Sequence, residues 1–555
     1  MIEKFQKLSS YFSKYGIDGY LMGTTDEFQS EYPSPGYRRL EYITNFSSTN
    51  AYLLIFKDKF YFFTDSRYIT AAKESGLNPY NISEIPGIKF EDGVKIGFNP
   101  KLFSKSQIKL FEKLDLVEVS EDLVDNIWDS RPVISESQIY EYDIKYAGES
   151  LESKIEKIRN ILKEKNISSA LISSSESVCW LLNIRSENDS DFSPVLLSKA
   201  YIDFDRVVLF ANLAESDSGN YEVRHISSLE NFLNKIDKKI LVPKDSNIST
   251  FSSIRQDLIY EDQDPILILK AQKNQAEIDG AKNAHIEDAI ALCEFFGWLE
   301  NNHHDQTEYS LSLKLTEFRK NSSLYKKDSF PSIVGMNSNG AKIHYRPDSN
   351  SSAKIENGIL LIDSGGHYFG GTTDVTRTIS IGEAKNEHRE YYTKVLKGHI
   401  ALAKIKFPKK ITGAHLDVLA RQYLWDNSED YMHGTGHGVG NFLSVHEHPP
   451  VIGLGSFNQP LLPGMIVSNE PGYYSEGKFG IRIENLQFVK KSSHHDEFYE
   501  FEQLTLAPYC KSLILFDRIS SDELGYLESY TENIEKYIEP HLSKLAKDYL
   551  LKNKI

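Results

Sequence analysis

A stretch of sequence near the N-terminus occurs a second time at a constant offset of 150 residues and without a gap. Residues 3–28, EKFQKLSSYFSKYGIDGYLMGTTDEF, align with residues 153–178, SKIEKIRNILKEKNISSALISSSESV. In each copy, apolar residues at helical spacing lead through a turn into a short apolar strand. The matching positions are Phe5, Leu8, Phe12, Ile17 and Leu21 in the first copy and Ile155, Ile158, Leu162, Ile167 and Leu171 in the second. Any amphipathic helix followed by a strand has this pattern, but the aligned turn and strand favour a duplication. We therefore predict two α/β domains in tandem.

Two segments mark domain boundaries. Residues 124–138, VDNIWDSRPVISESQ, contain Pro132 and polar residues that break the periodicity, which is typical of a linker. A second boundary falls near residues 261–282, after which a long amphipathic helix is predicted. Most of the chemically suggestive residues lie beyond residue 300. The predicted domains are 1–130, 131–268 and 269–555, the last including a C-terminal extension.

The composition excludes several classes of protein. No apolar run approaches the ~20 residues that span a bilayer, and the N-terminus lacks the features of a signal peptide. The three cysteines form no CxxC pair, which excludes a disulfide framework and fits a reducing cytosol. The formal charge of −16 argues against a general nucleic-acid binder. We expect a cytoplasmic protein that binds neither membranes nor nucleic acid.

Two aspartates stand inside apolar strands of the third domain. Residues 358–382, GILLIDSGGHYFGGTTDVTRTISIG, contain two such strands joined by a glycine-rich turn, and the strands carry Asp363 and Asp374. A buried carboxylate is costly unless it is paired or coordinated. One aspartate alone would be interpreted as a cap of the turn. Two on facing strands, with glycines that allow a close approach, favour a shared cation.

Two glutamates occupy similar places further along the chain. Residues 464–474, GMIVSNEPGYY, form an apolar strand that ends on Glu470 before a Pro-Gly turn. Residues 478–489, KFGIRIENLQFV, alternate apolar and polar positions and include Arg482 and Glu484. An isolated Arg-x-Glu strand is usually a cross-strand salt bridge on a solvated face. Here the acid again lies within a β-pattern, so its burial needs an explanation.

Four of the sixteen histidines fall within residues 433–450, HGTGHGVGNFLSVHEHPP. Four carboxylates that converge with one of these histidines would repel one another and raise each other's pKa. Two divalent ions roughly 3.5–4 Å apart would neutralise them and supply hydroxide near neutral pH. Oxygen ligands with one imidazole suit Mn²⁺, Co²⁺, Fe²⁺ or Zn²⁺. The predicted chemistry is therefore hydrolysis.

At this point the motifs carry a specific resemblance. The ligand series and the segments HGTGHGVGNFLSVHE, IHYRP and NAHIEDAIALCEFFGWLE resemble the pita-bread metallopeptidases, and among them the aminopeptidase P (Xaa-Pro aminopeptidase) family in its three-domain form. The N-terminal QSEY, RRLEYITNF and TDSRYITAAK extend the likeness over nearly the whole chain. DSGGHY departs from many relatives but affects no ligand. The resemblance implies a mixed α/β (α+β) chain in which two creatinase-N-terminal-like α/β domains precede a pita-bread catalytic domain.

The resemblance also implies a role for each site residue. The ligands of two divalent ions, with Mn²⁺ expected first and Co²⁺, Zn²⁺ or Fe²⁺ as alternatives, would be Asp363, Asp374, His437, Glu470 and Glu484. Glu470 would also act as proton shuttle. The residues that meet the substrate would be His344, His446, His433 and Arg67. Arg67 could equally form an ion pair of domain packing, and His448 has no implied role. Tyr474 and Arg482 would orient the carboxylates.

The implied reaction removes the N-terminal residue from peptides with proline at the second position. A hydroxide bridging the two metals would attack the carbonyl before proline, and Glu470 would pass the proton to the proline nitrogen. A prolidase, which cuts only Xaa-Pro dipeptides, would use the same five ligands, but it needs one N-terminal domain rather than two. A non-catalytic pita-bread scaffold is a further alternative, but such scaffolds lose metal ligands and all five are present here.

The C-terminal residues 520–555 have helical patterning, and the predicted packed face consists of Leu527, Tyr530, Ile534 and Tyr537. The resemblance implies a homodimer, to which this segment could contribute. A tail packed on the surface of its own domain is the plainer interpretation. The native metal, the preferred first residue and the peptide length do not follow from the sequence.

Overall fold

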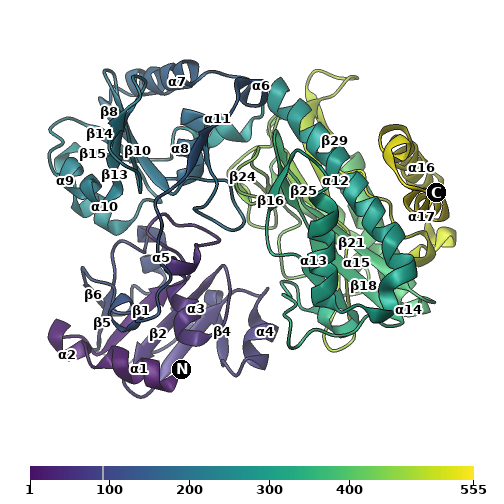
Figure 1. Ribbon diagram of the computed structural model, residues 1–555, viewed down its shortest axis with the longest axis horizontal. Helices are drawn as coiled ribbons and strands as arrows, with labels where there is room; N and C mark the ends of the chain where they lie inside the picture. The colour runs from purple at the N-terminus through teal and green to yellow at the C-terminus, as the bar shows by residue number, and fades with distance from the viewer. Residues whose placement is uncertain (91–92) are drawn as a thin grey trace. The chain divides into compact units, whose positions relative to one another are not determined.

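The N-terminal part of the chain contains two sheets built on one plan (Figure 1). The structure is a computed structural model that describes residues 1–90 and 93–555. The first sheet has the strand order β4-β3-β2-β1-β5-β6. Its strands are β1 (Gly19–Gly23), β2 (Ala51–Phe56), β3 (Phe60–Thr64), β4 (Pro79–Asn81), β5 (Lys95–Phe98) and β6 (Asp115–Glu118). Central β1 is antiparallel to β2 and parallel to β5.

The second sheet repeats this order and these directions. Its order is β12-β13-β11-β10-β8-β14-β15, and central β8 is antiparallel to β10 and parallel to β14. Its strands are β8 (Ser169–Ile172), β10 (Ser198–Asp203), β11 (Val207–Ala211), β12 (Ser216–Asp217), β13 (Glu222–His225), β14 (Ile240–Pro243) and β15 (Ile259–Asp262). Among the described residues, only the short edge strand β12 has no counterpart in the first sheet. The offset of 150 seen in the sequence places β1 on β8.

The central strands are apolar on both faces because both faces are covered. Successive side chains of a strand point to opposite sides. Accordingly, Leu21 and Leu54 belong to one core cluster of the first domain, whereas Met22 and Leu53 belong to the other. All ten apolar positions of the sequence repeat are buried. The helices differ, because the first copy is divided into α1 (Ile2–Ser9) and α2 (Phe12–Tyr15), whereas α7 (Leu151–Glu164) is continuous.

The chain forms two compact units. The first consists of residues 1–142 and 149–267, and the second of residues 143–148 and 268–555. The short helix α6 (Ile144–Ala147) thus belongs to the second unit, where Asn274 Nδ2 donates a hydrogen bond to the carbonyl of Ala147 at 2.8 Å. The predicted boundaries at residues 130 and 268 remain predictions.

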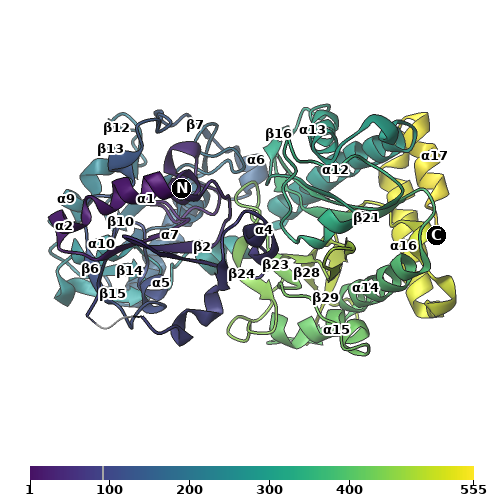
Figure 2. The same cartoon turned by 90° about the horizontal axis from the view of Figure 1, so that it is seen from below.

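The second unit has helices on both sides of its antiparallel strands, as Figure 2 shows. One side carries α12 (Gln275–Asn302) with α13 (Glu308–Arg319), and the other carries α14 (Asn386–Lys404) with α15 (Gly413–Trp425). Three strands form the order β17-β18-β21, and six form β22-β29-β28-β25-β23-β24. They are β17 (Ile333–Met336), β18 (Gly358–Ser364), β21 (Val375–Ile381), β22 (Lys406–Pro408), β23 (Gly436–Gly438), β24 (Glu447–Ile452), β25 (Ile466–Asn469), β28 (Asn485–Lys491) and β29 (Phe498–Gln503).

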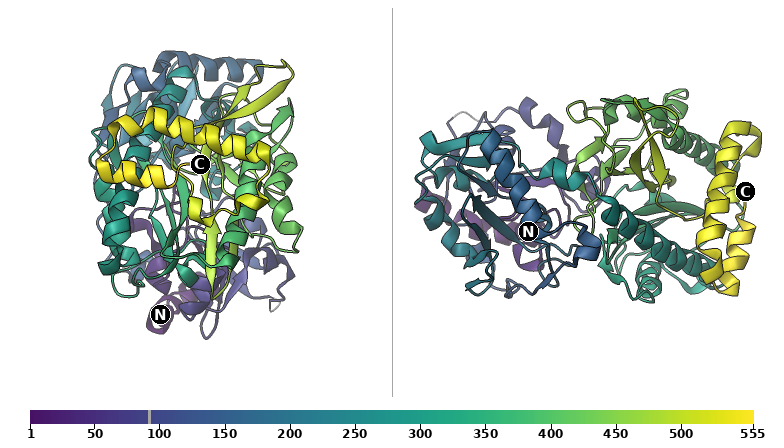
Figure 3. Two further views of the ribbon diagram at one scale, coloured as in Figure 1. Left: turned by 90° about the vertical axis from the view of Figure 1, so that its right-hand side faces the viewer. Right: turned by 90° about the horizontal axis from the view of Figure 1, so that it is seen from above.

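The C-terminal extension packs on its own unit. It forms α16 (Ser521–Tyr537) and α17 (Lys544–Lys552), the yellow helices of Figure 3. Helix α17 approaches α12 so closely that a Cβ on Gly297 would lie 2.8 Å from the backbone of Leu545. Leu527, Tyr530 and Ile534 are buried as predicted, but Tyr537 is 43% exposed because α16 ends there. No helix among the described residues is long and apolar enough to cross a bilayer.

Candidate metal centre

Asp363 and Asp374 are brought together by one antiparallel pair of strands. Asp363 lies near the end of β18, opposite Thr376 of β21, and Asp374 directly precedes β21. The glycine-rich connection is itself a small hairpin, β19 (Gly366–Tyr368) with β20 (Gly371–Thr372). A Cβ on Gly365 would lie 2.0 Å from the carbonyl oxygen of Thr373, so only glycine permits this approach. Both aspartates are buried, at 8% and 4% exposure.

Two strands of the neighbouring sheet supply the histidine and the first glutamate. His437 lies in β23, and Glu470 directly follows β25, with its N–H donating to the carbonyl of Thr435 at 2.8 Å. Ser468 serves both residues, because its Oγ accepts from the N–H of His437 at 2.9 Å and donates to Glu470 Oε1 at 3.1 Å. This hydroxyl was not anticipated from the sequence.

Glu484 reaches the site through a break between strands. The alternating β-pattern of residues 478–489 covers two strands, because β27 (Phe479–Arg482) pairs with β26 (Gly472–Ser475), whereas β28 belongs to the six-stranded sheet. The chain changes sheets at residues 483–484, which turns Glu484 inward at 2% exposure. Its N–H donates to the carbonyl of Thr376 at 3.1 Å, and its Oε2 accepts from Thr376 Oγ1 at 2.8 Å.

The donor atoms converge at one place. His437 Nε2 lies 3.4 Å from Asp374 Oδ2 and 3.5 Å from Glu470 Oε1. Three overlapping groups have all their donor atoms within 4.8 Å of one another. They are Asp374 with His437 and His446, His437 with Glu470 and Glu484, and Asp363 with Asp374 and Glu484. Each of the five predicted ligands belongs to at least one of these groups. Asp374, His437 and Glu484 belong to two groups each, so the three groups share one space.

Two further observations fit divalent ions at this position. Asp363 Oδ1 is buried and has no hydrogen-bond partner, which is costly for a carboxylate oxygen. The second concerns the tautomer of His437. Its Nδ1 lies 2.8 Å from the carbonyl of Gly438, an acceptor only, so Nδ1 carries the proton. In the neutral ring Nε2 then carries a lone pair that points at the carboxylates of Asp374 and Glu470. This arrangement is repulsive unless a cation lies between the imidazole and the carboxylates.

The pKa shifts of the predicted ligands also come from the burial and crowding of these charged groups. Burial, together with the charges of Asp374 and Glu470, raises the pKa of Asp363 to about 6 despite Arg482. Burial and the charge of Asp374 raise the pKa of Glu484 well above its usual range. Burial disfavours the charged form of His437, but the hydrogen bond to Asp374 and the charge of Glu470 outweigh it and raise its pKa to about 9. The protein alone therefore holds excess protons here, and a bound cation would replace them.

This arrangement predicts a pH-dependent effect of metal on stability. Between about pH 4 and pH 6, folded Asp363 keeps a proton that the unfolded chain has released. Because the folded state binds more protons, the contribution of Asp363 to the free energy of unfolding of chelated protein should fall as the pH rises through this range. Metal ions compete with these protons, so the Tm difference between Mn²⁺-loaded and chelated protein should widen from pH 5 to pH 7. A difference that is constant with pH would contradict this account.

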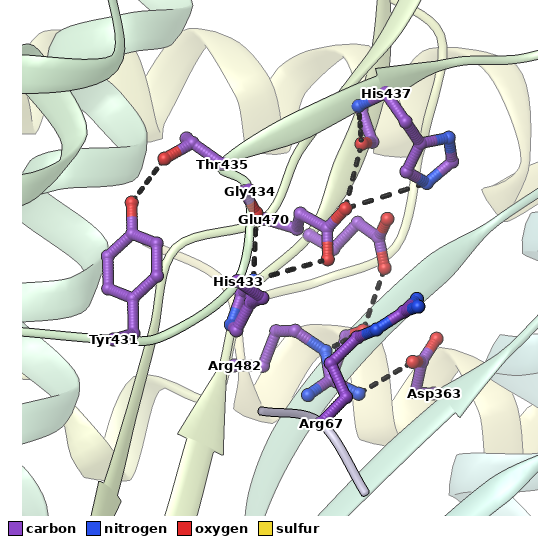
Figure 4. A network of polar contacts seen from close by, with 12 residues as sticks. Arg67, Asp363, Tyr431, His433, Gly434, Thr435, His437, Glu470 and Arg482 are labelled. Carbon is purple, nitrogen blue, oxygen red and sulfur yellow. Dashed lines mark hydrogen bonds and ion pairs between the residues drawn. The ribbon is translucent and has the colours of Figure 1, made fainter. Parts of the chain in front are cut away.

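A hydrogen-bonded chain connects Asp363 to His433 (Figure 4). Arg482 Nη2 donates to Asp363 Oδ2 at 2.6 Å, and Arg482 Nη1 donates to the Tyr474 hydroxyl at 2.8 Å. That hydroxyl donates to His433 Nε2 at 2.8 Å, because His433 Nδ1 carries the proton that bonds the carbonyl of Gly434. Arg482 Nε also donates to Thr376 Oγ1 at 3.1 Å. Arg482 and Tyr474 thus hold the orientation of Asp363, as expected for residues that support ligands.

A buried arginine secures the loop that carries His433. Arg421 Nη2 donates to the carbonyl of His433 at 2.8 Å, and Nη1 donates to the carbonyl of Tyr431 at 2.7 Å. Its Nε pairs with Asp417 at 2.8 Å, one turn earlier on α15. Sequence reasoning missed Arg421. The only available signal was the Asp-x-x-x-Arg spacing, which is common on exposed helices.

The remaining predicted residues lie as follows. The His446 ring stands 4.4 Å from that of His437, nearly perpendicular to it. His344 is half-buried and follows the 3-10 turn η7 (Asn337–Ala341), and His448 is exposed in β24. Arg67 forms a bidentate pair with Asp65 at 2.9 and 2.8 Å inside the first unit. This pair joins residues two positions apart, so both a role for Arg67 with substrate and a role in domain packing remain predictions.

Comparisons with known proteins match the whole chain to one family. Models of the metallopeptidase family M24 and of its C-terminal region match residues 279–491 and 497–554. Two models of the creatinase/prolidase N-terminal domain match residues 4–125 and 130–277. Xaa-Pro aminopeptidase 1 of Dictyostelium discoideum is 33% identical over 98% of this chain and 94% of that protein.

Solved structures agree with this match. An X-prolyl aminopeptidase of Caenorhabditis elegans, described as a cytosolic enzyme with a di-nuclear active site, covers all of this chain and 99% of its own with a TM-score of 0.93 and 30% identity. A prolidase of Pyrococcus horikoshii covers 99% of its own chain but 64% of this one, with a TM-score of 0.52 and 21% identity. The second likeness is one of fold alone. The predicted fold class, two creatinase-type domains followed by a pita-bread domain, is confirmed.

Proposed function

Because the chain belongs to metallopeptidase family M24, among its Xaa-Pro aminopeptidases, we propose that it removes the N-terminal residue from peptides with proline in second place. One observation of the site carries this proposal. Four carboxylates and one imidazole, from strands of two sheets, converge with their donor atoms a few ångströms apart. A scaffold protein has no reason to keep such a repulsive cluster buried. The cluster therefore favours the enzyme over the non-catalytic alternative.

We propose that the five ligands hold two divalent ions. The donor atoms of Asp374 lie close to those of His437 and also to those of Asp363 and Glu484, whereas Glu470 shares a group with His437 and Glu484. The ions would polarise the scissile carbonyl and acidify the attacking water. Mn²⁺ is proposed, with Co²⁺, Zn²⁺ and Fe²⁺ as alternatives, because the donors are mainly oxygen with a single imidazole. The di-nuclear site described for the Caenorhabditis elegans enzyme supports the number of ions.

The other residues of the site would handle substrate and protons. Glu470 is 18% exposed, so a substrate can reach it, and it would carry a proton to the leaving nitrogen. His446 and His344 would hydrogen-bond the reacting carbonyl and stabilise the charge that develops on it. His433 would line the pocket, fixed by Tyr474 on its side chain and by Arg421 on its carbonyl. Arg67 is proposed as a further contact with the peptide.

Proline explains why a dedicated site is needed. The bond before proline is a tertiary amide with no N–H and a fixed ring. An ordinary peptidase, which recognises an extended backbone, loses a hydrogen bond there. A free α-amino group that binds the metal centre or pairs with one of its acids would restrict cleavage to the first residue. A cytosolic location, as described for the Caenorhabditis elegans enzyme, and a homodimer are part of the proposal.

Three peptides test the proposal. We expect release of arginine from Arg-Pro-Pro but not from Arg-Ala-Pro, with loss of activity on chelation and recovery with Mn²⁺. The dipeptide Arg-Pro should be a poor substrate. Preference for Arg-Pro would make the protein a prolidase, and cleavage of none of the three under Mn²⁺ would favour a scaffold. Metal content measured on the same samples separates loss of ions from loss of the fold.

A further inference from the structure

Glu308 is a fully buried carboxylate outside the metal centre. It is the first residue of α13 and has no exposed surface. Both its oxygens accept hydrogen bonds. Oε1 accepts from the N–H of Met336 at 2.7 Å, and Oε2 accepts from the Tyr345 hydroxyl at 2.7 Å and from the N–H of Ala353 at 2.8 Å. The amide of Asn339 donates to both oxygens, at 3.0 and 3.1 Å.

The partners of Glu308 are all groups that can donate a hydrogen bond. Amide N–H groups can only donate, and the Tyr345 hydroxyl can donate as well. Within the part of the chain that the structure describes, no lysine, arginine or histidine forms a salt bridge with Glu308. The side chain is therefore held by neutral donors and lies at the N-terminus of α13.

All these donors belong to one segment, residues 336–353. Met336 is the last residue of β17, and between it and Gly358, where β18 begins, the chain forms no helix or strand except the turn η7 and an isolated bridge between Lys354 and Thr307. Residues 337–353 therefore lack the ladder of backbone hydrogen bonds that would otherwise fix their course. Glu308 supplies a substitute by bonding the segment at its start, its middle and its end. His344 lies within the segment, next to Tyr345.

The turn at the start of the segment is also packed tightly. A Cβ on Gly480 of β27 would lie 1.8 Å from the carbonyl oxygen of Gly340, so η7 rests directly against that strand. Strand β27 ends at Arg482, the residue that orients Asp363. The segment is thus held between Glu308 on one side and the backbone of the metal-centre strands on the other. Movement of the segment would displace His344 relative to the centre.

We propose that Glu308 is a positioning residue that holds residues 336–353 so that His344 meets the substrate at the metal centre. The proposal rests on the proposed function, because His344 has a substrate only if the protein is a peptidase. Among the described residues, Glu308 forms no hydrogen bond or ion pair with the proposed metal ligands or with residues 433–450. Its loss should therefore act through His344 and leave metal binding unchanged.

The isosteric substitution Glu308→Gln tests the proposal. The NH₂ group of the new amide would face the backbone N–H of either Met336 or Ala353. Two donors cannot hydrogen-bond each other, so the segment must shift. We expect kcat/KM for Arg-Pro-Pro to fall about tenfold or more while metal content stays unchanged. Tyr345→Phe removes one donor only and should give a smaller loss in the same direction. Tyr42→Phe, which removes a half-buried hydroxyl bonded to the Ile127 carbonyl in the first domain, should change kcat/KM less than twofold.

Coupling to His344 separates positioning from general destabilisation. In a His344→Ala background, Glu308→Gln should lower kcat/KM less than twofold further. The same factor in both backgrounds, or loss of metal, would overturn the proposal. Hydrogen exchange gives an answer that needs no substrate, because residues 336–353 should lose protection in Glu308→Gln and not in Tyr42→Phe. Unchanged protection would overturn the role of Glu308 even if the wild type cleaved no peptide, whereas inactivity alone would count against the proposed function.

Discussion

Asp363→Asn should abolish turnover, by ~10³-fold or more in kcat, in a chain that remains folded. Asp363 Oδ2 accepts from Arg482, and its buried Oδ1 faces the metal centre without a partner. An asparagine that keeps its oxygen toward Arg482 must point its NH₂ group at the place of the cations. The opposite rotamer sets that group against the guanidinium. Either orientation removes a ligand, so the metal content measured after dialysis should fall along with kcat.

A second buried aspartate provides the control for this variant. Asp203 of β10 accepts from the N–H groups of Asp205 and Arg206 and pairs with Lys238, all within the first unit. Asp203→Asn therefore loses a buried charge without losing a metal ligand, and should keep both metal and turnover. Full activity of Asp363→Asn in metal-free buffer would refute the metal-dependent mechanism. Equal loss in both variants would show that folding, not the centre, was affected.

The proposed metal ligands stand out in the sequence because they violate its pattern. Asp363 interrupts an apolar strand and Asp374 opens its partner, and such placements are expensive without a cation. The two N-terminal domains could be recognised because apolar spacing repeats at a constant offset. Both signals are local, since a helix or a strand fixes the relation between neighbouring residues.

Three further supporting contacts could not be predicted, because they join residues far apart in the chain. Thr376 meets Glu484, Arg421 secures the carbonyl of His433 and Glu308 binds residues 336–353. In the sequence, Thr376 has the pattern of an ordinary threonine in a strand. Glu308 has the pattern of an ordinary acidic residue in the first turn of a helix. The strand break before Glu484 was missed for a related reason. Alternation of apolar residues continues through it, although the chain moves from one sheet to another.

Glu470→Gln should lower kcat by roughly 10³-fold for a proline leaving group, because it removes both a ligand and a proton carrier. Glu470 Oε1 accepts from Ser468 and lies 3.5 Å from His437 Nε2, while Oε2 lies 3.9 Å from His433 Nδ1. The carboxylate thus stands between the ligand histidine and a pocket histidine, where it can take a proton from the attacking water and give it to the proline nitrogen. Ser468→Ala, which removes one support but no proton carrier, should cost less than about tenfold.

The leaving group distinguishes the two roles of Glu470. When thiazolidine-4-carboxylate replaces proline in the substrate, the ring is retained but its nitrogen is less basic and leaves with less need of a proton. If Glu470 delivers that proton, the ratio of wild-type to Glu470→Gln rates should shrink for the thiazolidine peptide, because the step that the variant lacks matters less. Asp363→Asn, which removes a ligand and no proton carrier, should show the same ratio for both peptides. A Glu470→Gln defect that is identical for the two leaving groups would leave Glu470 as a metal ligand only, and the proton would have to travel through His433 or His446.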